Sequence, residues 1–359
     1  MARALVVNRC GADALAGSAS RVGEIYVMLT WDCNLRCRMC PFWGSRGLCH
    51  TVGTGDEGLD VERLADWIPV GTAGPRTVTL SGGEPLLAPG WSALARTLVR
   101  RGVRVALTTN ATGLAEVADE DLRTLHQINV SLDGPAAVLE ELGRGGRGTL
   151  DAAIEGLRRV LDLGEPARPR LRLLAVSTPE GAGQLSALLD RLDRRGVSFD
   201  DLLIQHSMFL DETTAQRQRR VLTSVVGEGV PFWQALVDEP GRMDPAALAA
   251  DMAALEARPE PFTVSPPLAG RELAAYYGSG DHLPAAAGDH CLSPWLDLGI
   301  TPAGDVWLCP GHPVGNIQTH GFDAIWNGER ARALRTALVK DGLFPGCRAC
   351  FYLYNYKQM

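Results

Sequence analysis

Six short apolar segments, spread over residues 24–206, constrain the fold of this chain most strongly. They alternate with longer segments whose apolar residues recur at helical spacing, such as 150–163 with Ile154, Leu157 and Val160 on one face. Such alternation is typical of parallel sheets with right-handed helical crossovers. We therefore expect an α/β fold, a partial (β/α)6 TIM-like barrel. Its expected strands are 24–30, 77–80, 103–108, 128–132, 170–176 and 201–205.

The pattern changes after residue 210, where helices and then a compact C-terminal part are expected. Apolar spacing predicts helices at 213–226 and 244–258, the second with Asp244 as N-cap and Pro245 in its first turn. A proline-rich stretch leads from there to the last cysteines. We divide the chain into an N-terminal arm or short strand at 1–23, the barrel at 24–210, a helical connector or lid at 211–285, and a small domain with a β-hairpin and a helix at 286–359.

Net charge and hydropathy exclude several classes of partner. The chain of 359 residues has a formal net charge of −7, so it lacks the broad basic surface that nucleic acids attract, and we expect no nucleic-acid partner. No apolar run approaches the length of a signal-peptide core or a membrane span, which predicts a cytoplasmic protein that binds no membrane. In that reducing compartment its nine cysteines indicate metal ligation or catalysis rather than disulfides.

Three of these cysteines, Cys33, Cys37 and Cys40, follow the first expected strand directly. Three close thiolates suit an iron–sulfur cubane, because iron accepts soft sulfur ligands and three protein sulfurs leave one iron open to an outside ligand. A zinc knuckle is the alternative, with Cys49 or His50 as the fourth ligand.

The spacing of this triad resembles the signature of the radical S-adenosylmethionine (SAM) superfamily. The resemblance implies that Cys33, Cys37 and Cys40 are catalytic and hold a [4Fe–4S] cluster that binds SAM. Reduction of that cluster, by flavodoxin or ferredoxin, would cleave SAM to a 5′-deoxyadenosyl radical that removes a hydrogen atom from a C–H bond. One departure from the family is Met39, which stands where an aromatic residue usually precedes the third cysteine.

Segments after the next three strands also resemble the SAM-binding segments of the family. A glycine-rich Ser-Gly-Gly-Glu-Pro stretch follows the second strand, Thr-Asn follows the third, and Ser-Leu-Asp-Gly closes the fourth. The resemblance implies that they hold the amino group and the ribose of SAM. The candidate SAM-binding residues are Gly82, Gly83, Glu84, Asn110, Ser131 and Asp133.

Arg172 is a further candidate because a guanidinium inside an otherwise apolar strand needs an anion. That anion is either the SAM carboxylate or a helix carboxylate in a salt bridge. Candidate substrate contacts lie near the barrel mouth and in the connector, and Cys49 is a weak candidate hydrogen donor. The substrate-contact candidates are Gln205, His206, His282, His290 and Trp295.

A second group of cysteines, Cys291, Cys309, Cys347 and Cys350, lies near the C-terminus. Strand-like segments at 295–300 and 306–308 predict a hairpin with Gly304 in its turn, and a helix is expected at 322–339. This arrangement resembles the Twitch form of the SPASM domain, which implies one auxiliary [4Fe–4S] cluster with four cysteine ligands. The protein would then hold two [4Fe–4S] clusters. A structural zinc ribbon is the alternative.

A fully ligated auxiliary cluster is suited to accept an electron from a substrate radical. The resemblance therefore implies oxidation, by dehydrogenation or oxidative decarboxylation, of a sugar-like natural-product intermediate such as an aminoglycoside, a cyclitol or a nucleoside sugar in antibiotic biosynthesis. Maturation of a ribosomal peptide, by epimerisation or by a thioether or carbon–carbon crosslink, is the alternative. A non-enzymatic iron–sulfur or zinc-ribbon protein is the alternative from a different class.

Overall fold

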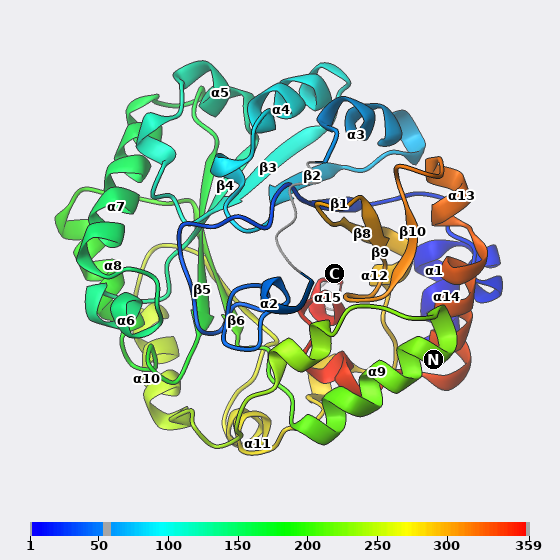
Figure 1. Cartoon of the computed structure of the whole chain (residues 1–359). Helices are drawn as coiled ribbons and strands as arrows, with labels where there is room; N and C mark the ends of the chain where they lie inside the picture. The colour runs from blue at the N-terminus through cyan, green and yellow to red at the C-terminus, as the bar shows by residue number, and fades with distance from the viewer. Residues whose placement is uncertain (1, 53–58, 357–359) are drawn as a thin grey trace.

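The computed structural model describes residues 2–52 and 59–356, which form a curved ten-stranded sheet surrounded by helices (Figure 1). The strand order is β10-β9-β8-β1-β2-β3-β4-β5-β6-β7, and β1 to β6 are parallel. These six strands confirm the predicted partial barrel. Their bounds are β1 Glu24–Met28, β2 Thr77–Ser81, β3 Arg104–Thr109, β4 Gln127–Ser131, β5 Arg170–Ser177 and β6 Asp201–His206.

Amphipathic helices cover the outer face of the barrel because each crossover buries one apolar stripe against the strands. In α7, for example, Leu150, Ile154, Leu157 and Val160 are all buried. These helices are α3 Val61–Trp67, α4 Trp91–Arg100, α5 Asp119–Thr124, α6 Ala136–Glu141, α7 Arg147–Asp162 and α8 Leu185–Arg194. The short helix α2 (Cys49–Val52) lies instead over the opening of the barrel (Figure 1).

The sheet continues on both sides of the six predicted strands. β7 (Phe262–Ser265), in the proline-rich stretch, pairs in parallel with β6. β8 (Asp297–Ile300) pairs in parallel with β1, and β9 (Asp305–Trp307) and β10 (Pro313–Asn316) follow antiparallel. The C-terminal hairpin is therefore part of the barrel sheet and lies directly beside β1 (Figure 1).

The connector and the C-terminal part are mostly helical. α9 (Glu212–Val226) matches the first predicted connector helix. The second is α10 (Pro245–Leu255), whose N-cap Asp244 accepts hydrogen bonds from the backbone N–H groups of Ala246 and Ala247, as predicted. The remaining helices are α11 Arg271–Gly278, α12 Ser293–Leu296, α13 Phe322–Trp326, α14 Glu329–Asp341 and α15 Phe351–Tyr354. Short 3-10 turns include η5 Phe232–Leu236, η6 Ala285–Ala287 and η7 Pro345–Ala349.

Three local predictions are wrong. The N-terminal arm holds a helix, α1 (Ala2–Cys10), and the 3-10 turn η1 (Ala12–Ala16) instead of a strand. The predicted helix at 322–339 is broken between α13 and α14, where the backbone at Gly328 is extended and the Asn327 side chain bonds the backbone of Ala19. Trp295 lies in the short helix α12, so the hairpin strand begins only at Asp297.

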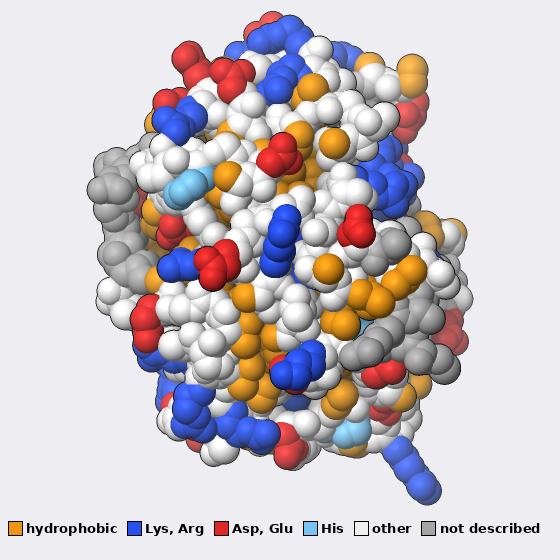
Figure 2. All heavy atoms as spheres, turned by 90° about the vertical axis from the view of Figure 1, so that its right-hand side faces the viewer, with side chains coloured by type: hydrophobic (Ala, Val, Ile, Leu, Met, Phe, Trp, Pro, Cys, Tyr) orange, Lys and Arg blue, Asp and Glu red, His pale blue; other side chains and the backbone are white. Residues whose placement is uncertain are grey.

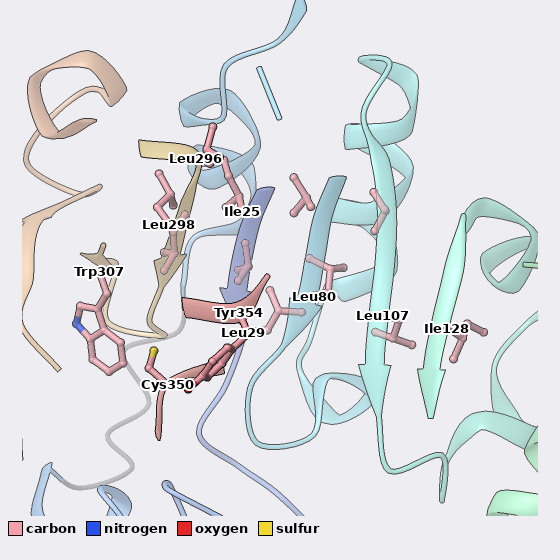
Figure 3. Packing of buried hydrophobic residues seen from close by; sticks show 14 of the residues in the cluster. Ile25, Leu29, Leu80, Leu107, Ile128, Leu296, Leu298, Trp307, Cys350 and Tyr354 are labelled. Carbon is pink, nitrogen blue, oxygen red and sulfur yellow. The ribbon is translucent and has the colours of Figure 1, made fainter. Parts of the chain in front are cut away.

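One continuous apolar core joins the strands to their covering helices. Figure 3 shows part of it, from Ile128 on β4 across Leu107, Leu80 and Ile25 to Leu298 on β8. A smaller cluster under the connector contains Phe209, Met243, Leu248, Leu268, Leu273, Tyr276 and Tyr277. No helix within residues 2–52 and 59–356 is both long enough and apolar enough to cross a membrane.

Candidate active site

The cysteine triad lies on the loop between β1 and α2, at the carboxyl end of the barrel. Burial raises the pKa of all three thiols, that of Cys37 to about 12. The charge of Cys40 also acts on Cys33 and Cys37, so the three sulfurs share one electrostatic environment. Buried thiols of this kind ionise when a metal binds them, because the metal bond offsets the loss of hydration.

The two glycines predicted to bind SAM pack directly against this cysteine loop. The Gly83 N–H donates to the Thr30 carbonyl at 2.7 Å, and the Glu84 N–H donates to the Asp32 carbonyl at 2.7 Å. A Cβ atom on Gly83 would lie 2.1 Å from the Asp32 oxygen, and one on Gly82, which has φ +131°, would lie 2.5 Å from the Thr30 oxygen. Only glycine lets the two loops approach so closely.

Glu84 is buried and joins the ends of two strands. Its carboxylate accepts hydrogen bonds from the Thr109 hydroxyl at 2.6 Å, the Asn110 N–H at 2.9 Å and the Leu86 N–H at 3.2 Å. Burial raises its pKa against the effect of these bonds. The Asn110 side-chain amide donates to the Asn34 Oδ1 at 2.9 Å, so the third strand also contacts the cysteine loop.

Asp133 forms a buried ion pair with Arg144, a residue that the sequence analysis missed. Arg144 also donates to the Ser131 carbonyl at 3.0 Å, and the Val176 N–H donates to Asp133 at 2.8 Å. The Arg144 charge lowers the pKa of Cys37 and opposes the effect of burial. Arg144 therefore places a buried positive charge beside the triad.

The signal for Arg144 in the sequence is its position in a glycine-rich turn. Gly143 has φ +71°, and a Cβ atom there would lie 2.5 Å from the Arg36 carbonyl oxygen. The Arg36 N–H donates to the Gly143 carbonyl at 3.2 Å and the Arg38 N–H to the Leu142 carbonyl at 2.9 Å. This turn thus holds the cysteine loop and carries Arg144 underneath it.

Arg172 lies apart from the other candidate SAM-binding residues. It pairs with Asp201, its register partner at the start of β6. Arg172 precedes Ser177, the last residue of β5, by five positions, which places it about 17 Å from the carboxyl end of the strand. The anion that it meets is therefore a carboxylate on a neighbouring strand, neither SAM nor a helix carboxylate.

The four C-terminal cysteines surround one small cavity of about 20 Å³. Its other walls are mainly apolar and include Trp233, Leu308, Phe344 and Tyr352. Burial and the charges of the other three cysteines raise the pKa of Cys309. No three His, Cys, Asp or Glu side chains of the described chain converge closely enough to hold a single metal ion. The four sulfurs enclose a volume with apolar walls, an environment that fits a buried cluster with cysteine ligands.

Arg348, between two of these cysteines, connects them to the helical connector. It is 1% exposed and donates hydrogen bonds to four backbone carbonyls. These carbonyls belong to His282 at 2.7 Å, Phe209 at 2.8 Å, Tyr276 at 3.0 Å and Gly280 at 3.1 Å. The guanidinium thereby holds Cys347 and Cys350 in place.

A cavity of about 820 Å³ occupies the interior of the barrel. Its wall consists of alternate, inward-facing residues of β1 to β6, which follow from the pleat of the strands. These include Tyr26, Thr79, Ser81, Ala106, Thr108, Asn129, Leu174, Leu203 and Gln205. Ser81 directly precedes the glycines that contact the triad loop, whereas Leu292 and Phe351 directly follow Cys291 and Cys350. The cavity wall thus contains chain neighbours of both sites, although none of the cysteines in the described chain lines it.

Among the predicted substrate contacts, only Gln205 lines this cavity within the described chain. His206 points away from it; its Nδ1 lies 2.8 Å from the Tyr277 hydroxyl, and burial lowers its pKa to about 4. Trp295 is buried and donates to the Ala14 carbonyl at 3.2 Å. His282 and His290 lie outside the cavity wall. Cys49 is buried near the triad, and burial raises its pKa to about 11.

Two family models match the chain at the two cysteine groups. The radical SAM superfamily model matches residues 27–168, and the model of the SPASM iron–sulfur cluster-binding domain matches residues 291–351. These matches imply SAM and a [4Fe–4S] cluster at the first group and auxiliary iron–sulfur binding at the second.

The curated relatives with similar sequences are named for activities other than the expected oxidation of a sugar. A GTP 3',8-cyclase of Rhodococcus opacus is 31% identical over 254 residues, which cover 67% of this chain and 68% of that protein. A GTP 3',8-cyclase of Streptomyces coelicolor is 37% identical, and an AdoMet-dependent heme synthase of Methanosarcina barkeri is 33% identical. These two matches span only 38% and 36% of the relatives' own length.

Among solved structures, SuiB of Streptococcus suis superposes with a TM-score of 0.59 at 15% sequence identity. The match covers 93% of this chain and 71% of SuiB. At this identity the likeness concerns the fold alone.

Proposed function

Because the chain belongs to the radical SAM superfamily and carries a SPASM-type cluster domain, we propose that it oxidises a polar, sugar-like small molecule inside the barrel. The observation that carries the proposal is the central cavity, whose largely polar wall contains chain neighbours of both sites: Ser81 precedes Gly82, and Leu292 and Phe351 follow Cys291 and Cys350. When bound, SAM and the two [4Fe–4S] clusters supply a hydrogen-abstracting radical and an electron acceptor.

The residues of the chain bind and enclose these groups. Cys33, Cys37 and Cys40 hold the first cluster and leave one iron for SAM; the four C-terminal cysteines ligate the second completely. We assign the SAM site to Gly82, Gly83, Glu84, Asn110, Ser131 and Asp133, which lie at the strand ends around the triad loop. The Arg172 guanidinium is left out of this set because Asp201 pairs with it.

The polar wall of the cavity supports a polar substrate. Hydroxyl groups of Thr79, Ser81 and Thr108 and the amide groups of Asn129 and Gln205 face its interior and offer hydrogen bonds to hydroxyl groups of a sugar. With a substrate in the cavity, the barrel wall would shield a reactive radical from water and so from side reactions. A flavodoxin or ferredoxin is the proposed reductant.

The test is anaerobic reconstitution followed by metal analysis and SAM turnover. We expect about eight irons per chain, falling to about four when Cys33, Cys37 and Cys40 are all changed to alanine. The wild-type protein should form 5′-deoxyadenosine under reduction, and the triple variant should not. Failure of the reduced wild-type protein to cleave SAM would overturn the proposal. About four irons with one zinc would replace the electron acceptor by a structural zinc site.

A further inference from the structure

Resting on the proposed function, we propose that the substrate is a phosphorylated small molecule whose phosphate binds arginines at the amino-terminal mouth of the central cavity. The mouth lies at the end of the barrel opposite the cysteine triad. Arg76 directly precedes β2 and Arg104 begins β3, so both side chains stand at this end of the sheet.

The charge of the cavity wall is opposite in sign to that of the protein. Among the residues that the structure describes, five arginines line the cavity and only one carboxylate does, although the whole chain carries a net charge of −7. The arginines are Arg9, Arg21, Arg76, Arg104 and Arg172, and the carboxylate is Glu24. On the face formed by α1, α13 and α14, by contrast, both signs of charge are interspersed (Figure 2). A concave positive site of this kind attracts anions and concentrates them.

Nearby carboxylates of the described residues compensate Arg172 but leave Arg76 and Arg104 without a counter-charge. Asp201 pairs with both Arg170 and Arg172, and Glu24 accepts a hydrogen bond from the Tyr26 hydroxyl at 2.6 Å. Within the described chain, Arg76 and Arg104 form no ion pair with a carboxylate. The Arg104 Nε donates to the Arg76 carbonyl at 3.4 Å, which brings these two residues side by side.

The pKa of a neighbouring histidine, His126, is also affected by this positive charge. His126 lies in the cavity wall, and its pKa is lowered by burial and then by the charges of Arg104 and Arg170. Because it lies between positive groups, its neutral form is favoured. His126 therefore adds no positive charge of its own, and the positive charge of the mouth comes from the arginines.

The chemistry of the guanidinium group favours phosphate. Its planar fork of N–H donors matches two oxygens of one phosphate, and charge-assisted bonds of this kind are about twice as strong as neutral ones. From Thr77 at the mouth, β2 rises about 13 Å to Ser81 below the triad loop. A phosphate held at the mouth thus leaves the body of the molecule extending toward the radical-forming end.

The test uses inorganic pyrophosphate as a probe, titrated calorimetrically into the reconstituted protein. We expect binding that weakens with added salt and at least tenfold weaker binding in the double variant Arg76→Gln, Arg104→Gln. Glucose 6-phosphate should also bind more tightly than glucose. The matched control is Arg158→Gln, Arg194→Gln, which removes the same charge from exposed positions on α7 and α8.

Two results would overturn the inference: no pyrophosphate binding by the wild-type protein, or equal weakening in the two double variants. SAM cleavage by the reduced wild-type protein, measured without pyrophosphate, reports separately on the proposed function. Loss of pyrophosphate binding with SAM cleavage intact therefore contradicts only the phosphate site. Folding of each variant is checked by its iron content and its thermal midpoint.

Discussion

At the scale of single residues, Arg144 is the side chain whose loss should affect the triad most. The Arg144→Met variant would leave Asp133 buried without a counter-charge, which costs about 3–5 kcal/mol of stability. It would also remove the charge that lowers the pKa of Cys37, so iron at the first site should bind more weakly. Iron content and chemical denaturation measure the two effects. Arg144→Lys, which retains the charge, should recover part of the iron; no difference between the variants would contradict this explanation.

From a second residue, Asp297, we predict how the free energy of unfolding depends on pH. It is 1% exposed, and burial raises its pKa to about 7 although Tyr356 and Ser293 donate hydrogen bonds to it. Because this folded-state pKa exceeds the unfolded value, the protonated form stabilises the fold, and stability is lost as the pH rises toward 7. Between about pH 5.5 and 7 the loss should be about 2 kcal/mol, levelling off above pH 7.

Urea denaturation across this pH range tests the assignment. Asp297→Asn should flatten the dependence, because the amide keeps an acceptor for Tyr356 but does not titrate. The exposed Asp341→Asn variant should retain the wild-type slope. An equally steep slope in Asp297→Asn would assign the dependence to other groups.

At the scale of elements, the contact between the glycine segment and the cysteine loop is the tightest point of the site. In Gly83→Ala the new methyl group would overlap the Asp32 and Trp31 carbonyls, at 2.1 and 2.4 Å, so the loop must shift. We expect a loss of about 1–3 kcal/mol and of the iron at the triad. Absorbance of the reconstituted cluster and iron content measure this.

The control for that variant is another glycine of the barrel. A Cβ atom on Gly148, in α7, meets nothing within 4 Å, so Gly148→Ala should keep its iron and gain up to about 1 kcal/mol. Equal iron in both variants would show that the close approach at Gly83 is unimportant for the cluster.

The elements also show what the sequence could and could not predict. Local patterns predicted β1 to β6, because short, largely apolar segments alternate along the chain with longer segments of helical spacing. The cysteine spacing likewise predicted both cysteine groups. The pairing of β8 with β1 could not be predicted, because it joins segments far apart in the chain and no local pattern marks it. Arg172 was misassigned for the same reason, since its partner Asp201 lies on another strand.

At the scale of the whole molecule, Arg348 connects the auxiliary site to the rest of the chain. Arg348→Met would leave four buried carbonyls without a donor, at a cost of at least about 2 kcal/mol. With the cysteines loosened, we expect about half of the iron to be lost while the reduced protein still cleaves SAM. Iron analysis and 5′-deoxyadenosine formation provide the two readouts.

The matched control is Arg332→Met, an exposed position on α14 that should leave both readouts unchanged. If Arg348→Met kept all of its iron, the four hydrogen bonds would be unnecessary for the second cluster. If Arg348→Met also lost SAM cleavage, the triad site would depend on the C-terminal cysteine site, although the two groups of cysteines are separate in the chain.

The parallel pairing of β8 with β1 limits how such an enzyme can be recombined. The two strands match residue for residue from Glu24 and Asp297 to Val27 and Ile300, and β1 leads directly into the triad loop. A chimera that receives its C-terminal part from another enzyme must also supply an edge that fits β1. The auxiliary domain is therefore not an exchangeable module, and we expect successful grafts to carry β1 and the hairpin together.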